Sequence, residues 1–235
     1  MNTLPNALEE RKDNLHTHLD LAQAMELHLV DGAPMLIGAT TLSVGHLLTI
    51  KSALIIHLYN IVEAIMTRTI EEVGIAVKLE SPVKWSNNTL REWLRSYASI
   101  DGGQENRLNL FQDAALKLLT KESIGTAAFK KPTGSWHDKQ IHVFSKRLNV
   151  SFPLTPSIAR KIQRSVRYGD KTPLEFLADR RNAIAHGRRT FENGANDLTM
   201  KDIRDLADVT IEYMEHAATA FQNYLDNKKY LAGIV

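Results

Sequence analysis

Apolar residues recur along most of this chain at intervals of three, four and seven positions, which is the spacing of one face of an α-helix. The first such stripe lies in residues 4–29 and consists of Leu8, Leu15, Leu19, Ala22 and Leu29. From Thr41 to about Val73 the sequence is apolar on several sides, which predicts a long central helix buried in the fold. Further stripes in residues 106–120 and 200–225 predict two more helices.

Polar residues mark where several of these helices begin and end. Residues 89–92 have the threonine-to-glutamate spacing of a capping box, and residues 155–168 begin with Thr-Pro and continue as a further helix. Residues 172–175, Thr-Pro-Leu-Glu, combine an N-cap threonine, a proline at the first helical position and a glutamate three residues after the cap. Gly187 stands where a left-handed residue ends this helix, and residues 199–202 cap the last long helix.

The same pattern contains no alternation of apolar and polar residues longer than a few positions, and no internal repeat. Strands in a half-buried sheet would require such alternation. We therefore predict an all-α fold: an antiparallel helical bundle in one domain that spans residues 1–235, with an inserted helical region at about 78–130.

The composition is that of an ordinary globular protein, with 43% hydrophobic and 24% charged residues. The absence of cysteine excludes disulfides and cysteine-based catalysis, and it favours a reducing, cytoplasmic setting. The first residues lack the apolar core of a signal peptide. The longest apolar run is interrupted by His57, Asn60 and Glu63, and is too short to cross a bilayer, so we expect no membrane association.

Charge is unevenly distributed although the net charge is only +2. Residues 129–189 contain 14 lysines and arginines against 4 aspartates and glutamates, whereas the segments on either side are each acidic overall. A basic middle segment between acidic flanks suggests a surface that faces a polyanion. A basic face that is merely solvated would give the same counts.

Familiar metal and hydrolase motifs are missing from the sequence. His16 and His18 lie two positions apart, which on a helix turns their side chains about 200° away from each other. No Glu-x-x-His, His-Glu-x-x-His, glycine-rich phosphate loop or Gly-x-Ser-x-Gly occurs. We therefore expect no metal and no cofactor.

The stretch "DRRNAIAHGRR" of residues 179–189 contains an arginine followed by a histidine five positions later, Arg181 and His186. Spacing alone decides little, because a chain of this composition contains by chance roughly 1.6 pairs in which four to six residues separate an arginine from a following histidine. Arg11 with His16 or His18 has similar spacing, but it lies in a polar helix among acidic neighbours. Arg181 and His186 instead flank a small apolar stretch at the end of a well-capped helix, in the most basic part of the chain.

"RRNAIAHG", followed by "TFENG" and a long terminal helix that ends in "NYLDNKKYL", resembles the HEPN superfamily, and most of all its branch of predicted bacterial ribonuclease toxins and defence proteins. "LLTIKSALIIHLYNIVEAIM" is similar to the apolar helix with an embedded glutamate in that branch. "GSWHDKQIHVFSKRLNV" is similar to the glycine- and aspartate-containing segment that leads to the motif helix. The resemblance covers about 41–75 and 132–231, and leaves the first 30 residues and 78–130 unexplained.

The resemblance implies an antiparallel bundle that forms a homodimer, with the Arg-x4-His motif of each protomer facing a shared cleft. It implies RNA as the partner molecule, and an antitoxin or another defence-system protein as a partner that restrains the activity. HEPN toxins paired with small nucleotidyltransferases have a tyrosine two positions after the histidine, where this chain has Arg188. This departure argues against regulation by nucleotidylation of such a tyrosine.

The residues themselves suggest how the motif would work. Arg181 and His186 are about 140° apart around a straight helix, so one helix cannot easily aim both at one phosphate, whereas a two-fold dimer can bring two copies together. In metal-independent RNA cleavage, His186 would act as general base on the ribose 2′-OH or as general acid at the leaving 5′-oxygen. Arg181 would stabilise charge on the pentacoordinate phosphate. The products would be a 2′,3′-cyclic phosphate and a 5′-OH.

Neighbouring residues have candidate supporting roles. Asn182 could hold the histidine or the phosphate, or could bond locally. Glu63 lies in an apolar run where an unpaired carboxylate is costly, so it is expected to pair with Arg180 or Arg181, or to form a structural ion pair elsewhere. Contacts to the RNA backbone would come from basic side chains that could equally be solvated surface: Lys161, Arg164, Lys171, Arg188 and Arg189.

Two other classes of function remain open at this point. One is a catalytically inactive HEPN module that binds RNA or another protein through the basic helix end. The other is a helical scaffold in which His186 only satisfies a carbonyl at the helix terminus.

Overall fold

The structure is a computed structural model that describes residues 3–32, 36–37, 40–98, 104–120 and 129–233. Helices account for most of these residues, with one hairpin of two-residue strands, which confirms the all-α prediction. The α-helices in the described part are α1 (Leu4–Val30), α2 (Val44–Lys78), α3 (Asn87–Ala98), α4 (Gln104–Thr120), α5 (Asp138–Leu148), α6 (Pro156–Lys161), α7 (Pro173–Ala185) and α8 (Met200–Asp226). The shorter elements are β1 (Leu36–Ile37), β2 (Thr40–Thr41) and the 3₁₀ turns η1 (Pro82–Lys84) and η2 (Val166–Tyr168).

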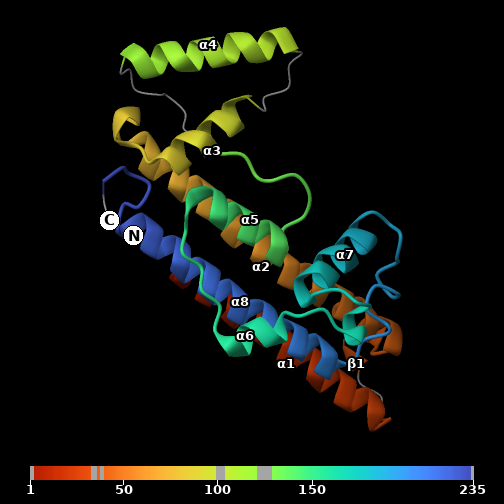
Figure 1. The fold of residues 1–235 in the computed structure, drawn as a ribbon. Coiled ribbons are helices and arrows are strands. Elements are labelled where there is room, and N and C mark those ends of the chain that lie inside the picture. The colour runs from red at the N-terminus through yellow and green to blue at the C-terminus, as the bar shows by residue number, and fades with distance from the viewer. Residues whose placement is uncertain (1–2, 33–35, 38–39, 99–103, 121–128, 234–235) are drawn as a thin grey trace.

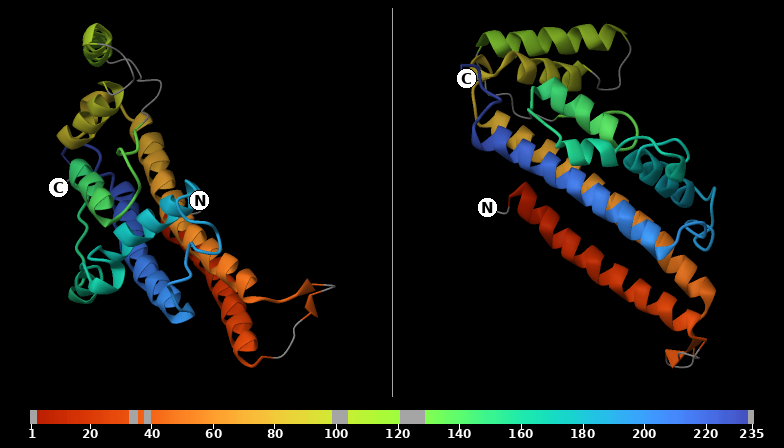
Figure 2. Two further views of the ribbon diagram at one scale, coloured as in Figure 1. Left: turned by 90° about the vertical axis from the view of Figure 1, so that its right-hand side faces the viewer. Right: turned by 60° about the horizontal axis from the view of Figure 1, so that its bottom comes forward.

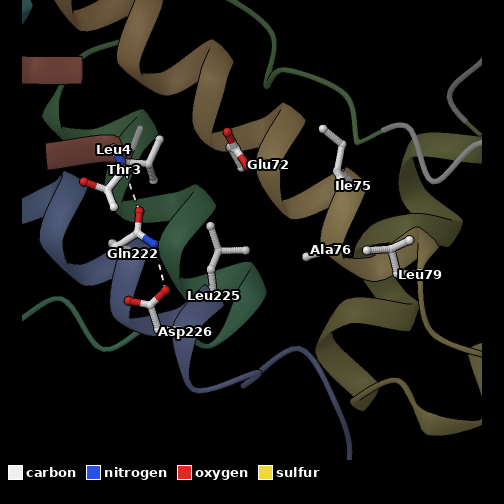
Figure 3. A pocket seen from close by; sticks show the side chains of 9 residues that line it. All are labelled: Thr3, Leu4, Glu72, Ile75, Ala76, Leu79, Gln222, Leu225 and Asp226. Carbon is white, nitrogen blue, oxygen red and sulfur yellow. Dashed lines mark hydrogen bonds between the residues drawn. The ribbon is translucent and has the colours of Figure 1, made fainter. Parts of the chain in front are cut away.

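Three long helices, α1, α2 and α8, lie side by side and form the body of the molecule (Figures 1 and 2). α1 is antiparallel to α8, because the Leu4 N–H donates to the Gln222 side chain at one end while Arg204 pairs with Asp20 towards the other. α2 and α8 run in the same direction, and their C-terminal ends share one groove with the start of α1 (Figure 3). The bundle is therefore only partly antiparallel, since the segment α3–α7 returns the chain to the starting end.

α2 is the central helix, as its apolar sequence predicts. It packs against α1, α7 and α8, and its buried side chains extend along most of its length. Within the described residues it is the one helix with the length and hydropathy of a membrane span, and half of that apolar stretch is buried inside this fold. Its apolar character thus fits the core of a bundle.

The region expected as an insertion is joined closely to the rest of the molecule. Trp85 and Trp93 are buried in the same core as the long helices, with their rings edge to face at 5.8 Å. The C-terminal tail pairs with this segment, since the Ser86 N–H donates to the Tyr230 carbonyl over 2.9 Å. Only α4 projects beyond the other helices, where it packs on α3 (Figure 1). Residues 99–103 and 121–128 of the expected insertion lie outside the described residues.

Most of the predicted helix starts are confirmed, and one is wrong. Residues 172–175 and 199–202 form complete capping boxes, and Thr155 caps α6. α3, however, begins at Asn87, so that Ser86 is its cap and accepts the Thr89 N–H over 3.2 Å. Thr89 is instead buried within the helix, where its hydroxyl donates to the Tyr230 carbonyl of the C-terminal tail.

The helix predicted from Thr155 to Tyr168 is also shorter than expected. α6 ends at Lys161, and Ser165 forms an isolated bridge with Lys171. Gly169 has a φ of +62°, which turns the chain back towards that bridge. This turn places the residues after it at the start of α7.

The capping box of α8 generates a prediction about pH. The Thr199 hydroxyl and N–H donate to Asp202, and Arg167 binds the same carboxylate. These hydrogen bonds, led by the one from the Thr199 side chain, lower the pKa of Asp202 from 3.8 to about 2. Because the pKa is lower in the folded chain, the carboxylate stabilises the fold above about pH 4, and this contribution is lost as the pH falls towards 2.

We therefore expect Asp202→Asn to lower the Tm at pH 7, and the difference from wild type to shrink as the pH approaches 2. Circular dichroism melts across this pH range measure both effects. Asp208→Asn is the control, because Asp208 is an exposed carboxylate on the same helix. A difference between Asp202→Asn and wild type that stays constant with pH would contradict the prediction.

Candidate active site

The start of α7 is fixed by a polar contact with α5. Thr172 caps α7 in a capping box with Glu175, and its hydroxyl also donates to Asp138 Oδ1 over 2.7 Å. Burial acts to raise the pKa of Asp138, but the neighbouring His137 and the Thr172 hydroxyl lower it, and the net pKa lies below the ordinary value. Asp138 is therefore a charged anchor for the helix that carries the Arg-x4-His motif.

Arg181 makes three contacts, two with the central helix α2 and one with its neighbour on α7. Its Nη2 donates to Glu63 Oε2 over 3.0 Å, its Nη1 donates to Asn182 Oδ1 over 3.1 Å, and its guanidinium lies 4.6 Å from the centre of the Tyr59 ring. The Tyr59 hydroxyl in turn accepts the Trp136 N–H over 3.0 Å. The predicted pairing of Glu63 with an arginine of the motif is thus confirmed for Arg181, whose side chain keeps 26% of its surface exposed.

The loop before α5 contributes two further contacts, one to Glu63 and one to Asn182. Lys131 Nζ lies 2.6 Å from Glu63 Oε1, so one carboxylate serves two cations. Asn182 donates to Ser135 Oγ over 2.7 Å, which shows local bonding by its amide. Sequence reasoning missed Tyr59, Lys131 and Ser135. The spacing of Tyr59 four positions before Glu63 places the two on one face of α2, and is the one signal that could have identified it.

His186 is the residue at which α7 ends. Its backbone N–H donates to the Asn182 carbonyl over 3.0 Å, and Gly187 follows with a φ of +69°, as predicted for this helix stop. The imidazole is exposed and has no hydrogen-bond partner among the residues that the structure describes. His186 thus satisfies a carbonyl at the helix terminus, as the scaffold interpretation expects, but through its backbone N–H and not through the ring.

Arg180 does not support Glu63, contrary to one of the two expected pairings. It is buried, with 8% of its side chain exposed, and forms a two-point contact with Asp197 through Nη1 and Nη2. Nη1 also donates to the Gly194 carbonyl over 3.0 Å. Successive helix positions differ by about 100°, so only one of two adjacent arginines can face α2. The other, Arg180, fastens the loop that follows the motif.

That loop fits closely against the central helix. A Cβ atom at Gly194 would collide with the Ser52 hydroxyl and with Ile184, so only glycine allows this approach. The loop thereby covers Ile184 within α7. Arg181 and Arg180 thus bind α7 to the core on one side and to this loop on the other.

With this arrangement of the motif, comparison with known proteins decides the family. The sequence matches the HEPN_MAE_28990-like HEPN family over residues 2–230. The chain belongs to this HEPN family. Neither a curated protein nor a solved structure matches it. The HEPN match includes the first 30 residues and the segment 78–130, which the recognisable motifs alone leave unexplained.

Each of the five basic residues proposed for RNA contact has a carboxylate neighbour in the HEPN structure. Lys161 pairs with Glu212 on α8, which joins α6 to the bundle body. The remaining four surround α7 in these pairs: Arg164–Glu175, Lys171–Asp179, Arg188–Asp179 and Arg189–Asp197. None of these contacts tests RNA binding.

In the ion pairs around the HEPN motif, cationic side chains outnumber the carboxylates that they share. Three carboxylates, Glu63, Asp179 and Asp197, each serve two cations, and Glu175 serves one. In these pairs seven cationic side chains therefore share four carboxylates, an excess of three positive charges. Arg164 and Lys171 also line a polar groove beside Asn182.

No group of three or more potential metal ligands occurs in the described part of the chain. The chemistry that the HEPN motif can offer with its own side chains is proton transfer by His186 and charge stabilisation by Arg181. A mainly apolar groove lies at the C-terminal end of α2, between the start of α1 and the end of α8, and none of the motif residues lines it (Figure 3).

The two adjacent arginines should differ sharply in their effect on stability. Arg180→Ala leaves the Gly194 carbonyl and Asp197 without their buried donor, so we expect the free energy of unfolding to fall by about 1–3 kcal/mol. Arg188→Ala is the control; its side chain is 62% exposed, and we expect a change within about 0.5 kcal/mol. Urea denaturation followed by circular dichroism measures both. Equal effects from the two variants would contradict a fastening role for Arg180.

Proposed function

We propose that this HEPN protein is a metal-independent endoribonuclease that acts in the cytoplasm as a toxin or anti-phage effector. The observation that carries the proposal is the contrast within one motif. Arg181 is oriented by Glu63, Asn182 and Tyr59, whereas the His186 ring is exposed and has no partner in the described structure. The oriented guanidinium of Arg181 suits the stabilisation of negative charge. The exposed imidazole of His186, which has no hydrogen-bond partner among the described residues, suits proton transfer.

The proposed reaction is internal transesterification of RNA. The ribose 2′-oxygen attacks the adjacent phosphorus as an imidazole of His186 removes the 2′ proton, and the bond to the 5′-oxygen breaks as a second imidazole protonates it. Arg181 neutralises charge that builds on the non-bridging oxygens. The products are a 2′,3′-cyclic phosphate and a 5′-OH, so no water molecule and no metal-bound hydroxide takes part.

The reaction requires two chains. Arg181 faces α2, and His186 stands about 140° further around the helix axis at the exposed end of α7. A homodimer with a two-fold axis near the ends of the two α7 helices supplies two imidazoles, one as base and one as acid. It also supplies two arginines from which a phosphate can draw its donors.

The RNA backbone is proposed to lie along the surface around α7, where several cationic side chains share carboxylates. Arg164, Lys171, Arg188 and Arg189 would contact phosphates without reading the sequence, as Lys161 would from α6. Their partners are carboxylates of the same chain, so the RNA replaces existing ion pairs. A protein antitoxin that covers the same basic surface would restrain the activity.

One observation favours a second candidate, a catalytically inactive HEPN module that binds RNA or another protein. Arg181 uses two of its nitrogens and one face of its guanidinium on Glu63, Asn182 and Tyr59. An arginine engaged in this way can be structural, in which case α7 would only present a basic surface. The two candidates differ in whether RNA is cut or merely bound.

Cleavage assays with purified protein and single-stranded RNA distinguish these candidates. We expect His186→Ala to reduce the cleavage rate by about 10²–10⁴-fold, because proton transfer is lost. For Arg181→Ala we expect a reduction of about 10²–10³-fold. The chain provides matched controls, since Arg11 and His16 have the same spacing on α1 and their alanine variants should cleave at the wild-type rate.

Expression of the same four variants in cells measures toxicity. Growth should be inhibited by wild type and by both α1 variants, and restored by His186→Ala and Arg181→Ala, while all four variants remain folded dimers in sedimentation experiments. Binding of RNA by wild type without cleavage would establish the inactive module instead.

The mechanism makes a separate prediction about cofactors and substrate. Cleavage should continue at an unchanged rate in EDTA, because none of the proposed steps uses a metal. A substrate with a single 2′-deoxyribose at the cleavage site should remain intact there, because the nucleophile is missing. Both are measured by gel analysis of end-labelled RNA, and cleavage of the deoxy substrate or inhibition by EDTA would rule the mechanism out.

A further inference from the structure

The two histidines of the "HTH" sequence on α1 cannot chelate one ion together, but one of them has a partner on another helix. His18 is exposed on α1, and His57 lies on α2 where the two helices pack together. Their Nδ1 atoms are 3.3 Å apart, and their ring centroids are 5.2 Å apart with the ring planes tilted by 56°. His16, two residues away, has no part in this contact.

The separation of the two nitrogens also fits a shared metal ion. The contact is a long hydrogen bond of 3.3 Å, at the upper end of the range for ring-nitrogen donors. Two imidazole nitrogens that bind one tetrahedral Zn²⁺, each at about 2.0–2.1 Å, lie about 3.3–3.4 Å apart. The distance between the two Nδ1 atoms therefore matches the distance between two ligands of one tetrahedral Zn²⁺.

Nothing else in the described structure occupies these nitrogens. The contact with each other is the one hydrogen bond of either Nδ1 atom among the described residues. Metal ions bind imidazole through a ring nitrogen in its neutral form, and each of these rings presents its Nδ1 atom to the other.

We propose that His18 and His57 form a two-histidine site for a divalent transition metal ion of the Zn²⁺ class, which joins α1 to α2. Water completes the coordination, because no third metal-binding side chain gathers with this pair in the described residues. Arg11 repels any cation here, so hard ions that bind by charge alone, such as Mg²⁺, are disfavoured. Ions that prefer imidazole nitrogen overcome this repulsion. The proposal is independent of the nuclease activity, which uses the α7 side of α2.

Isothermal titration calorimetry of the full-length chain with ZnCl₂ tests the site. We expect one Zn²⁺ per chain, with the affinity reduced at least about tenfold by His18→Ala and by His57→Ala. His16→Ala is the matched control and should bind like wild type, and MgCl₂ should give no signal. Failure of wild type to bind, or an equal loss in His16→Ala, would overturn the proposal. One zinc per two chains would do so as well, because it would place the site between copies.

Two further measurements distinguish loss of the metal site from misfolding of a variant. Because His18 is exposed, His18→Ala leaves the core intact and should abolish a Zn²⁺-induced rise in Tm that His16→Ala retains. In NMR spectra of the wild-type protein, one equivalent of Zn²⁺ should shift the ring signals of His18 and His57 together. Shifts confined to other histidines would show binding elsewhere and refute the assignment.

Discussion

The ion pair between Glu63 and Arg181 is the interaction on which the site depends. Glu63 lies where the apolar helix α2 meets α7, and it keeps 31% of its side chain exposed, so its charge is shared between a cationic partner and solvent. The motif helix supplies this partner, and the loop before α5 adds a second cation in Lys131. This ion pair, together with the Tyr59 ring, orients α7 on the central helix. Through that helix it also determines where His186 meets solvent, although the two residues are far apart in sequence.

α7 is held on several sides at once, and each attachment has a different chemistry. Its start is anchored through Thr172 to Asp138, and Arg180 ties it to the following loop through a buried contact with Asp197. Only its end carries no such attachment among the described residues, and this end bears His186. The exposed imidazole thus belongs to an otherwise rigid helix. Such a support is what a proton-transfer group requires, because small errors of position are costly in catalysis.

Local patterns in the sequence were sufficient for the parts of the fold that depend on near neighbours. The all-α class, the central helix, the Thr172 and Thr199 caps and the stop at Gly187 follow from periodicity and capping rules, and the pairing of Glu63 follows from the cost of burying it. The contacts of Tyr59, Lys131 and Ser135 join segments far apart in the chain, for which no local pattern exists. The prediction of Thr89 as the cap of α3 was wrong for the same reason, because the Thr89 hydroxyl donates to a carbonyl of the distant C-terminal tail. The choice between Arg180 and Arg181 depended on the rotation of α7, which its neighbours fix.

The sharing of carboxylates around α7 has a consequence for how any polyanion would be measured there. Counterion release is read from the slope of log affinity against log salt concentration, and each phosphate neutralised by a lysine or arginine contributes by releasing the small cations condensed on it. On this surface the cations are already balanced in part by side chains of the same protein, which cannot diffuse away. A phosphate that takes the place of such a side chain leaves a free carboxylate, which attracts dissolved cations in turn, so the net number of ions released is smaller. The slope would then understate the number of phosphates in contact, and a weak dependence on ionic strength would not indicate a small footprint.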